Sequence, residues 1–346
     1  MKPHRMLSAG IAAVAALTLG LAGCAGPGTT PNDSPSSTPS DSQSSAPADK
    51  TYTIGVAVIV SHPALQAVQD GFEEVLKEQK VNYKLITENA QGEAANATTI
   101  ASSFHSNPDI DLILAISTPI ALAMATAEKD RPILFSAVTD PVKDGIVPSW
   151  DKAGTNITGT SDKNPEAKPV ALVKEAMPDV KTIGVLYSSS ESNSLAQLDD
   201  YKTEAAALGI TIKPQGITSA AEITAGLAAL KGVDAILIPT DNNVVAAIST
   251  VVGFGQENKI PVFCADNSTL AKGTVATRGL SYHDLGRRTG EMAVDILVKG
   301  VAINTIKPEA TTATDLQINT GAAAKFGLTL PDSLVKAASK DVQTTG

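Results

Sequence analysis

Residues 181–195 read K-T-I-G-V-L-Y-S-S-S-E-S-N-S-L, so that an apolar segment runs directly into a cluster of hydroxyl, carboxylate and amide side chains. The segment 182–187 is short and rich in β-branched residues, which is typical of a parallel strand covered on both faces. The polar cluster 188–194 supplies candidate N-caps for a helix that begins near Ser192. Ligands bind at the carboxyl ends of strands in open α/β sheets, so this stretch predicts a binding loop.

An earlier segment of the chain repeats this pattern. The tetrapeptide T-I-G-V occurs at residues 53–56 and again at 182–185. Two further pairs keep the same order and nearly the same spacing, namely D-L-I-L at 111–114 with D-A-I-L at 234–237, and R-P-I-L-F at 131–135 with I-P-V-F at 260–263. The repeat predicts two lobes of the same topology.

Within each half, apolar segments alternate with amphipathic ones, which is the pattern of βαβ units around a parallel sheet. The expected strands are 52–60, 83–88, 111–116 and 133–137 in the first half, and 182–187, 211–215, 235–239 and 261–265 in the second. The expected helices are 63–79, 94–106 and 119–129, then 194–208, 220–230 and 243–257. The predicted fold class is therefore α/β, with two doubly wound parallel-sheet lobes and a ligand cleft between them.

Polar residues follow the expected strands in both halves. They are Ser61, His62, Ser117, Thr118, Thr139 and Asp140 in the first half, and residues 188–194, Thr240, Asp241, Asn242, Asp266, Asn267 and Ser268 in the second. Helix capping explains any one of these loops. Six such loops on the same edge of two matched sheets favour a shared binding cleft.

Composition limits the kind of partner. The chain has 346 residues, enough for two lobes of ordinary size, and 43% of them are hydrophobic. The formal net charge is −9, and no cluster of Lys and Arg occurs that would bind phosphates. We therefore expect no nucleic-acid partner.

The first residues resemble a bacterial lipoprotein signal. Lys2 and Arg5 precede an apolar run at 11–21, and L-A-G-C at 21–24 matches a lipobox. Residues 1–23 are then a signal peptide and Cys24 is the lipidated residue. The alternatives are an ordinary signal peptide with a chance cysteine and a membrane anchor that is too short to span the bilayer properly.

The segment that follows the signal predicts a tether. Residues 24–50 consist largely of Ser, Pro, Thr, Gly, Ala and Asp, a composition that cannot bury enough apolar surface to become ordered. The protein is therefore expected outside the cytoplasm, held at the cell membrane by its lipid anchor only.

Signatures of enzymes and metal sites are missing from the sequence. The four His, at positions 4, 62, 105 and 283, lack metal-ligand spacing, and no nucleophile-elbow, dinucleotide or P-loop motif follows a strand. Cys264, inside P-V-F-C-A, is better explained as a buried apolar residue than as a nucleophile. Asp140, Asp241, Asp266 and Glu191 could supply an acid/base pair of the kind that glycosidases use, but no other feature of the sequence supports an enzyme. We expect no enzyme activity, no metal and no cofactor.

Short motifs occur in order along residues 51–338. They are H-P-A-L at 62–65, N-A-Q-G at 89–92, S-T-P-I-A at 117–121, A-V-T-D-P at 137–141, N-I-T-G at 156–159, S-E-S-N-S at 190–194, P-T-D-N at 239–242 and L-G at 285–286. Together they resemble the substrate-binding lipoproteins of bacterial ABC importers, in the branch that binds aromatic amino acids. The resemblance implies a type I periplasmic-binding-protein fold, a small-molecule ligand, an ABC permease as partner and a monomer.

The resemblance also implies where the chain passes between lobes. Three crossings, near Thr160, at 278–281 and near Thr311, would give a first lobe of 51–160 plus 282–311. The second lobe would then comprise 161–281 plus 312–346. Crossings of this kind act as hinges that allow closure around a ligand.

The expected mechanism is reversible binding of an amino acid without covalent chemistry. Hydroxyl and N–H groups of Ser190, Asn193, Ser194 and Thr118 are candidates for the ligand carboxylate, because helix N-termini favour anions. Asp241 or Asp140 would accept the ammonium group. Further candidate ligand-binding residues are His62, Thr139, Tyr187, Glu191, Asn242 and Asp266.

Some alternatives stay open on the sequence. His62 either packs against the ligand's side chain or faces solvent, and Arg278 is more readily a surface charge at a hinge than a carboxylate clamp. A lipid-anchored sensor or adhesin would have the same fold, and so would a binding protein for sugars or nucleosides.

Overall fold

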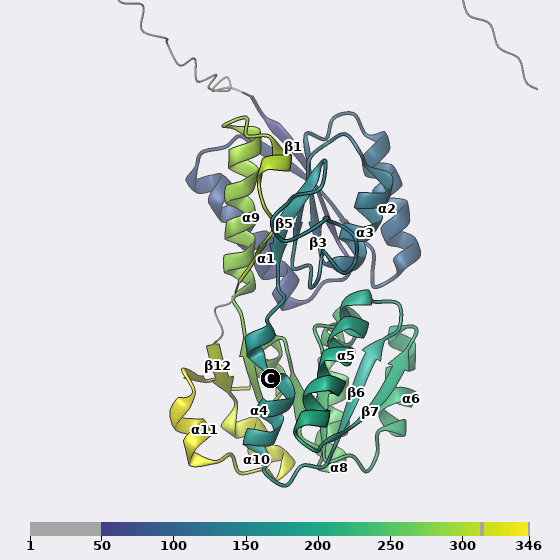
Figure 1. The fold of residues 1–346 in the computed structure, drawn as a ribbon, viewed down its shortest axis with the longest axis vertical. Coiled ribbons are helices and arrows are strands. Elements are labelled where there is room, and N and C mark those ends of the chain that lie inside the picture. The colour runs from purple at the N-terminus through teal and green to yellow at the C-terminus, as the bar shows by residue number, and fades with distance from the viewer. Residues whose placement is uncertain (1–49, 312–314, 345–346) are drawn as a thin grey trace, which may run out of the picture. The chain divides into compact units, whose positions relative to one another are not determined.

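The structure, a computed structural model, describes residues 50–311 and 315–344. The predicted signal peptide, Cys24 and nearly all of the tether lie outside these residues. From Lys50 onward the chain forms two α/β lobes, shown in Figure 1. In the part of the chain that the structure describes, no helix has the length and apolar character needed to cross a membrane.

Lobe 1 is built on a six-stranded parallel sheet with the order β11-β5-β4-β3-β1-β2. Its strands are β1 (Tyr52–Val58), β2 (Tyr83–Asn89), β3 (Leu112–Ile116), β4 (Ile133–Ser136), β5 (Ile157–Ser161) and β11 (Glu309–Ala310). Helices α1 (Pro63–Glu78) and α9 (Tyr282–Leu297) pack together on one face, and α2 (Ala94–Ser106) and α3 (Thr118–Ala127) cover the other (Figure 1). Strands β1, β3, β4 and β5 are buried along their whole length, which explains the largely apolar character of β1, β3 and β4.

Lobe 2 is built on a four-stranded parallel sheet with the order β7-β6-β8-β9. Its strands are β6 (Thr182–Ser188), β7 (Thr211–Ile217), β8 (Ala235–Ile238) and β9 (Val262–Cys264). Its helices are α4 (Pro169–Ala176), α5 (Ser192–Ala207), α6 (Ile223–Ala229), α7 (Asn242–Ala246), α8 (Ile248–Asn258), α10 (Thr320–Phe326) and α11 (Asp332–Ala337). A separate small sheet pairs β10 (Ala276–Gly279) with β12 (Asp315–Ile318) antiparallel and β12 with β13 (Lys340–Asp341) in parallel.

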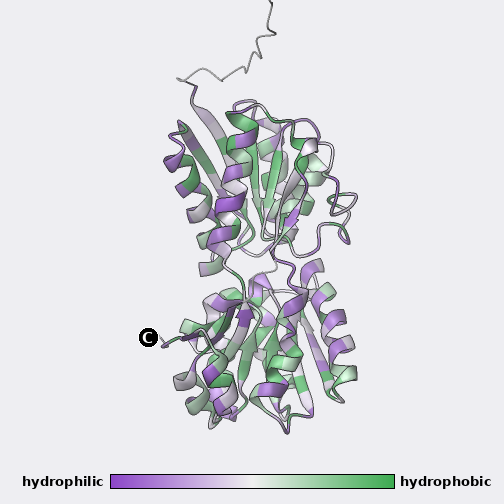
Figure 2. Cartoon of the chain, turned by 60° about the vertical axis from the view of Figure 1, so that its left-hand side comes forward, coloured by the Kyte–Doolittle hydropathy of each residue, from purple (hydrophilic) through white to green (hydrophobic). Residues whose placement is uncertain are grey.

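The two main sheets share one topology. The order β2-β1-β3-β4 in lobe 1 corresponds to β7-β6-β8-β9 in lobe 2, as the sequence repeat predicts. In Figure 2 the strands inside both lobes are largely hydrophobic, whereas much of the helical surface is hydrophilic. The predicted α/β class with two doubly wound parallel sheets is confirmed.

The structure differs from the predicted elements at one helix above all. The single helix expected at 243–257 is divided at Ala247, where the backbone has φ −103° and ψ 17°. The short first piece, α7, is held by Asp241, whose side chain caps it. Strands β5 and β10 and helix α4 were not predicted, because their apolar runs are short and interrupted by polar residues.

Close helix packing returns α9 to lobe 1 although it follows lobe 2 in the sequence. A Cβ atom at Gly71 of α1 would lie 2.1 Å from the carbonyl oxygen of His283, and one at Gly286 of α9 would lie 2.0 Å from that of Val68. Both distances are shorter than any real contact, so only glycine allows the two helices to approach this closely. This packing fixes the start of α9, and therefore Tyr282, beside the junction of the lobes.

Candidate functional site

Loops at the carboxyl ends of the strands meet between the lobes. His62, just before α1 in lobe 1, lies with Nε2 3.4 Å from Oδ1 of Asn242 and Nδ1 3.9 Å from a carboxylate oxygen of Asp266, both in lobe 2. The hydroxyls of Thr139 and Thr240 lie 3.5 Å apart across the same boundary. His62 is 8% exposed, so it does not face solvent.

These loops enclose a small pocket, here called the interlobe pocket. Its free volume is about 10 Å³, room for one water molecule at most. The lining residues are His62, Leu65, Thr118, Ala137, Thr139, Asp162, Asn193, Thr240, Asp241, Asn242, Val245, Asp266 and Tyr282. The structure thus brings together His62, Thr118, Thr139, Asn193, Asp241, Asn242 and Asp266 from the predicted set.

Three side-chain atoms in this pocket have unused hydrogen-bonding capacity. Nδ1 of His62, Oδ1 of Asp162 and Oδ1 of Asn193 are buried and have no hydrogen-bond partner among the described residues. Buried polar atoms are almost always paired in folded proteins. Three unpaired atoms around one pocket therefore indicate a site for a polar ligand.

Asp241 is fully buried, and both its oxygens already have partners. It accepts hydrogen bonds from the backbone N–H of Ser188 (2.5 Å), the hydroxyls of Ser188 (2.9 Å) and Ser194 (2.7 Å), and the N–H of Val244 (2.9 Å). These bonds tie the loop after β8 to the loop after β6. The contacts of Asp241 show that it holds these two loops together. Its role as the acceptor of the ligand's ammonium group stays a prediction.

Glu191 strengthens the same connection. Its carboxylate receives the backbone N–H groups of Asn242 (3.1 Å) and Asn243 (3.3 Å) and the side-chain amides of Asn242 (2.5 Å) and Asn193 (3.1 Å). Burial, together with the nearby Asp241, raises the pKa of Glu191 to about 8, although the N–H donors oppose this shift. Glu191 therefore lies behind the pocket wall and positions Asn193 and Asn242.

Asp162 is the acidic residue that sequence reasoning missed. It is 6% exposed, and one oxygen accepts a hydrogen bond from the hydroxyl of Tyr282 (3.0 Å) while Oδ1 has no partner. Burial raises the pKa of its carboxyl group. Asp162 directly follows β5, and a position just after a strand is the feature that could have identified it as a site residue. The sequence resemblance assigns this segment to a crossing between the lobes instead of a strand.

Asp140 has a different environment. It forms an ion pair with Lys163 and accepts the backbone N–H of Lys143 at 3.1 Å. The ammonium of Lys163 also lies 6.0 Å from the ring centroid of Trp150. Asp140 therefore already has a cationic partner, unlike Asp162.

Other predicted residues lie outside the interlobe pocket. Tyr187 is half-buried beside Gly216 of β7, and Ser190 is exposed. Ser194 is buried and donates to Asp241, so it supports the pocket from behind. A contribution of Tyr187 or Ser190 to binding stays a prediction.

Arg278 and Cys264 lie outside the interlobe pocket, and neither has a role in binding or catalysis that its contacts support. Arg278 forms an ion pair with Glu175 (2.6 Å), which suits a charge at a hinge. Cys264 is buried as a free thiol, and burial raises its pKa to about 12, so it is a packing residue rather than a nucleophile.

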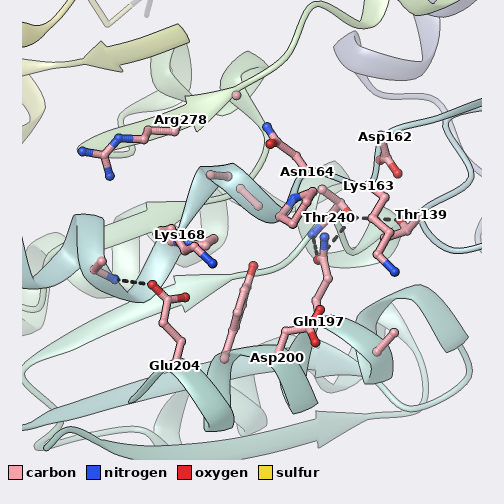
Figure 3. Close-up of a pocket in the computed structure, with 18 of the residues that line it drawn as sticks. Thr139, Asp162, Lys163, Asn164, Lys168, Gln197, Asp200, Glu204, Thr240 and Arg278 are labelled. Carbon is pink, nitrogen blue, oxygen red and sulfur yellow. Dashed lines mark hydrogen bonds between the residues drawn. The ribbon is translucent and has the colours of Figure 1, made fainter. Parts of the chain in front are cut away.

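A larger cavity of about 660 Å³ adjoins the interlobe pocket, and we call it the α4–α5 cavity. It shares Thr139, Asp162, Thr240 and Tyr282 with the interlobe pocket. Figure 3 shows Thr139, Asp162 and Thr240 at one end and Arg278, Lys168 and Glu204 at the other, with α5 along one side. The two spaces therefore meet at a common wall.

The interlobe pocket is acidic. Asp162, Asp241 and Asp266 line it, and His62 is the one basic side chain among the described lining residues. Burial lowers the pKa of His62, which favours its neutral form, although Asp266 opposes the shift. Buried charges need partners, so a cationic group is the ligand chemistry that this pocket favours.

Two matched α/β lobes with a buried polar pocket closed between them define a solute-binding protein. Residues 53–342 match the family model described as ABC transporter substrate binding protein, and the chain belongs to this family. Its members are extracytoplasmic proteins that bind a small molecule and work with an ABC transporter; they are not enzymes. The fold is that of type I periplasmic binding proteins.

Relatives and solved structures agree with this assignment. A "Tyrosine-binding protein" of Clostridioides difficile (strain R20291) is 36% identical over 275 residues, which cover 78% of this chain and 79% of that protein. A Streptococcus pneumoniae ABC domain in complex with L-Trp is 34% identical, with a TM-score of 0.81, and the match covers 85% of this chain and 100% of that one. A ligand-free, open substrate-binding protein with adhesive properties from Clostridium difficile is 38% identical, with a TM-score of 0.62 and coverage of 85% and 100%.

The TM-scores of the last two structures do not follow their sequence identities. The structure resembles the L-Trp complex more closely than the open, ligand-free protein, although the open protein is more similar in sequence. The contacts of His62 and Thr139 across the lobe boundary are those of a closed arrangement.

Proposed function

We propose that this chain is the lipid-anchored, extracytoplasmic binding protein of an ABC importer and that it captures an aromatic L-amino acid by closing its two lobes. The observation that carries the choice of an amino acid is the unpartnered, buried Oδ1 of Asp162 in an acidic pocket with a single basic side chain. The aromatic class is supported by the tyrosine- and L-Trp-binding relatives.

We assign the ligand's ammonium group to Oδ1 of Asp162 and Oδ1 of Asn193. The amide nitrogen of Asn193 already donates to the carbonyl oxygen of Thr240 (2.9 Å) and to Glu191 (3.1 Å), so the free atom of Asn193 is an acceptor. An acceptor suits an ammonium group better than the carboxylate that the sequence pattern suggested. Charge-assisted hydrogen bonds of this kind are among the strongest in proteins.

We assign the ligand's carboxylate to the side of the pocket formed by lobe 1. Thr118 lines the pocket at the first residue of α3, where free backbone N–H groups and the helix dipole favour an anion. Nδ1 of His62 has no hydrogen-bond partner. Because Nε2 faces the acceptor Oδ1 of Asn242, Nδ1 donates to the carboxylate when the ring is protonated, and a carboxylate beside the ring favours that form. A carboxylate held there would complete the bridge between the lobes.

The ligand class is tested by thermal shift of the mature protein with single compounds. L-Trp, L-Tyr and L-Phe should raise Tm by about 5 °C or more at a hundredfold excess over Kd, because a ligand that binds only the folded form stabilises it. Indole-3-propionate, which lacks the ammonium group, should raise Tm less. A flat response to all three aromatic amino acids contradicts the proposed ligand.

The anchor is tested separately by the variant Cys24→Ser in the full-length chain. We expect the protein to leave the membrane fraction, because Cys24 is the lipidated residue of the L-A-G-C motif. The matched control is Cys264→Ala, which alters the other cysteine and should leave the protein with the membranes. Retention of Cys24→Ser on membranes excludes the lipid anchor.

A further inference from the structure

We propose that the α4–α5 cavity receives the side chain of the bound amino acid and that the hydroxyl of Tyr201 favours side chains ending in a hydrogen-bonding group. This inference rests on the proposed function and deepens it, because it gives the ligand's side chain a place in lobe 2. It also names a residue that distinguishes tyrosine and tryptophan from phenylalanine.

Space is the first argument. The interlobe pocket, with about 10 Å³ free, has no room for an aromatic side chain. The adjoining cavity has about 660 Å³, within the range of small-molecule sites. Asp162 and Tyr282 line both spaces, so an ammonium group at Asp162 stands at the entrance to the cavity.

The chemistry of the cavity wall is the second argument. Apolar residues such as Ala171, Ala196 and Leu280 line it. Two charged residues of the wall already have partners, since Arg278 pairs with Glu175 (2.6 Å) and Glu204 accepts the backbone N–H of Ala171 (2.8 Å). Asp140 and Lys163 of the wall pair with each other, and Lys168 and Asp200 are exposed to solvent. The buried part of the wall beyond Asp162 therefore suits an apolar side chain more than a second charged group.

The third argument is a buried hydroxyl group with no partner. Tyr201 of α5 lines the cavity and is 3% exposed, and its hydroxyl has no hydrogen-bond partner among the described residues. Burial raises the pKa of Tyr201 well above its usual value, so the group stays a neutral hydroxyl that can donate or accept. A phenol O–H or an indole N–H of the ligand would satisfy it, whereas a phenyl ring would not.

Calorimetric titration of Tyr201→Phe tests the role of the hydroxyl. We expect the affinity for L-Tyr and L-Trp to fall about fivefold, the effect of losing one neutral hydrogen bond, while the affinity for L-Phe stays unchanged. The matched control is Tyr83→Phe, which removes a hydroxyl that donates to Glu73 in lobe 1 and lines neither space. Unchanged affinity for all three amino acids, or an equal loss for all three, overturns the assignment to Tyr201.

Filling the cavity tests where the side chain lies. Ala196→Leu adds bulk to the cavity wall and should weaken all three aromatic ligands about tenfold or more. Ala206→Leu adds the same bulk on an exposed position of the same helix and should bind like the wild type. Unfolding curves of each variant separate lost binding from lost folding, and Ala171→Leu replaces Ala196→Leu if the latter does not fold.

The outcomes distinguish the two proposals. If the wild type binds none of the aromatic amino acids, the proposed function fails. If the wild type binds them and the folded cavity-filling variant binds equally well, the function stands and the cavity is not the side-chain site.

Discussion

Lobes 1 and 2 share one strand order but differ in how their polar loops are held. In lobe 2, Asp241 and Glu191 receive eight hydrogen bonds between them, and six of these join the loops after β6 and β8. In lobe 1, no hydrogen bond among the described residues joins the corresponding loops after β1 and β3. The N–H of Thr139 donates to the hydroxyl of Thr118 (3.2 Å), which joins the loops after β3 and β4 instead. Lobe 2 therefore presents a preorganised half of the site, and lobe 1 completes it on closure.

The two lobes also differ in the strands that lie next to the segments connecting them. Lobe 1 extends its sheet with the parallel strands β5 and β11, whereas lobe 2 continues into the antiparallel pair β10 and β12. The chain leaves β5 at Asp162 and enters α9 at Tyr282, and the two side chains meet between the lobes. The segments that connect the lobes thus contribute directly to the pocket.

The largest effect is expected from Asp241→Ala in lobe 2. The substitution removes the cap of α7 and leaves Ser188 and Ser194 with buried, unpaired donors. The free energy of unfolding should fall by about 3–5 kcal/mol, measured by urea denaturation without ligand. Asp140→Ala, at a partly exposed ion pair, should cost less than about 1 kcal/mol. Equal losses would contradict the view that lobe 2 is held by its buried carboxylates.

A smaller effect on stability is expected from His62→Ala in lobe 1. His62 makes its polar contacts with Asn242 and Asp266 of lobe 2, so its loss should affect closure more than folding. The free energy of unfolding should change by about 1 kcal/mol or less, while the affinity for an aromatic amino acid falls about tenfold. A loss of stability as large as that of Asp241→Ala would show that the two lobes are not held differently.

Much of the fold could be predicted because its pattern is local. Apolar segments such as 182–187 have a composition that only a buried strand explains, and the T-I-G-V repeat showed that this topology occurs twice. The division of 243–257 at Ala247 could not be predicted, because it depends on contacts of α7 with residues distant in sequence.

The sequence indicated where the site lies, but it did not indicate what each of its residues does. Strand ends directed attention to His62, Asn193 and Asp241, and the structure brings all three to one pocket. Their roles depend on which atoms are already paired, and a sequence does not contain that information. For the same reason Asp241 appeared to be a free carboxylate, and Asp162, at the end of an unpredicted strand, was overlooked.

In the proposed complex the buried carboxylate of Asp162 holds the ligand's ammonium group, and this contact can be tested by calorimetric titration of Asp162→Asn with L-Trp and L-Tyr. Asparagine keeps the shape and the bond to Tyr282 but removes the charge. The matched control is Asp140→Asn, because Asp140 is paired with Lys163. We expect the affinity of Asp162→Asn to be about 10- to 100-fold weaker and that of Asp140→Asn to be nearly unchanged. Wild-type affinity in Asp162→Asn, or a larger loss in Asp140→Asn, would contradict it.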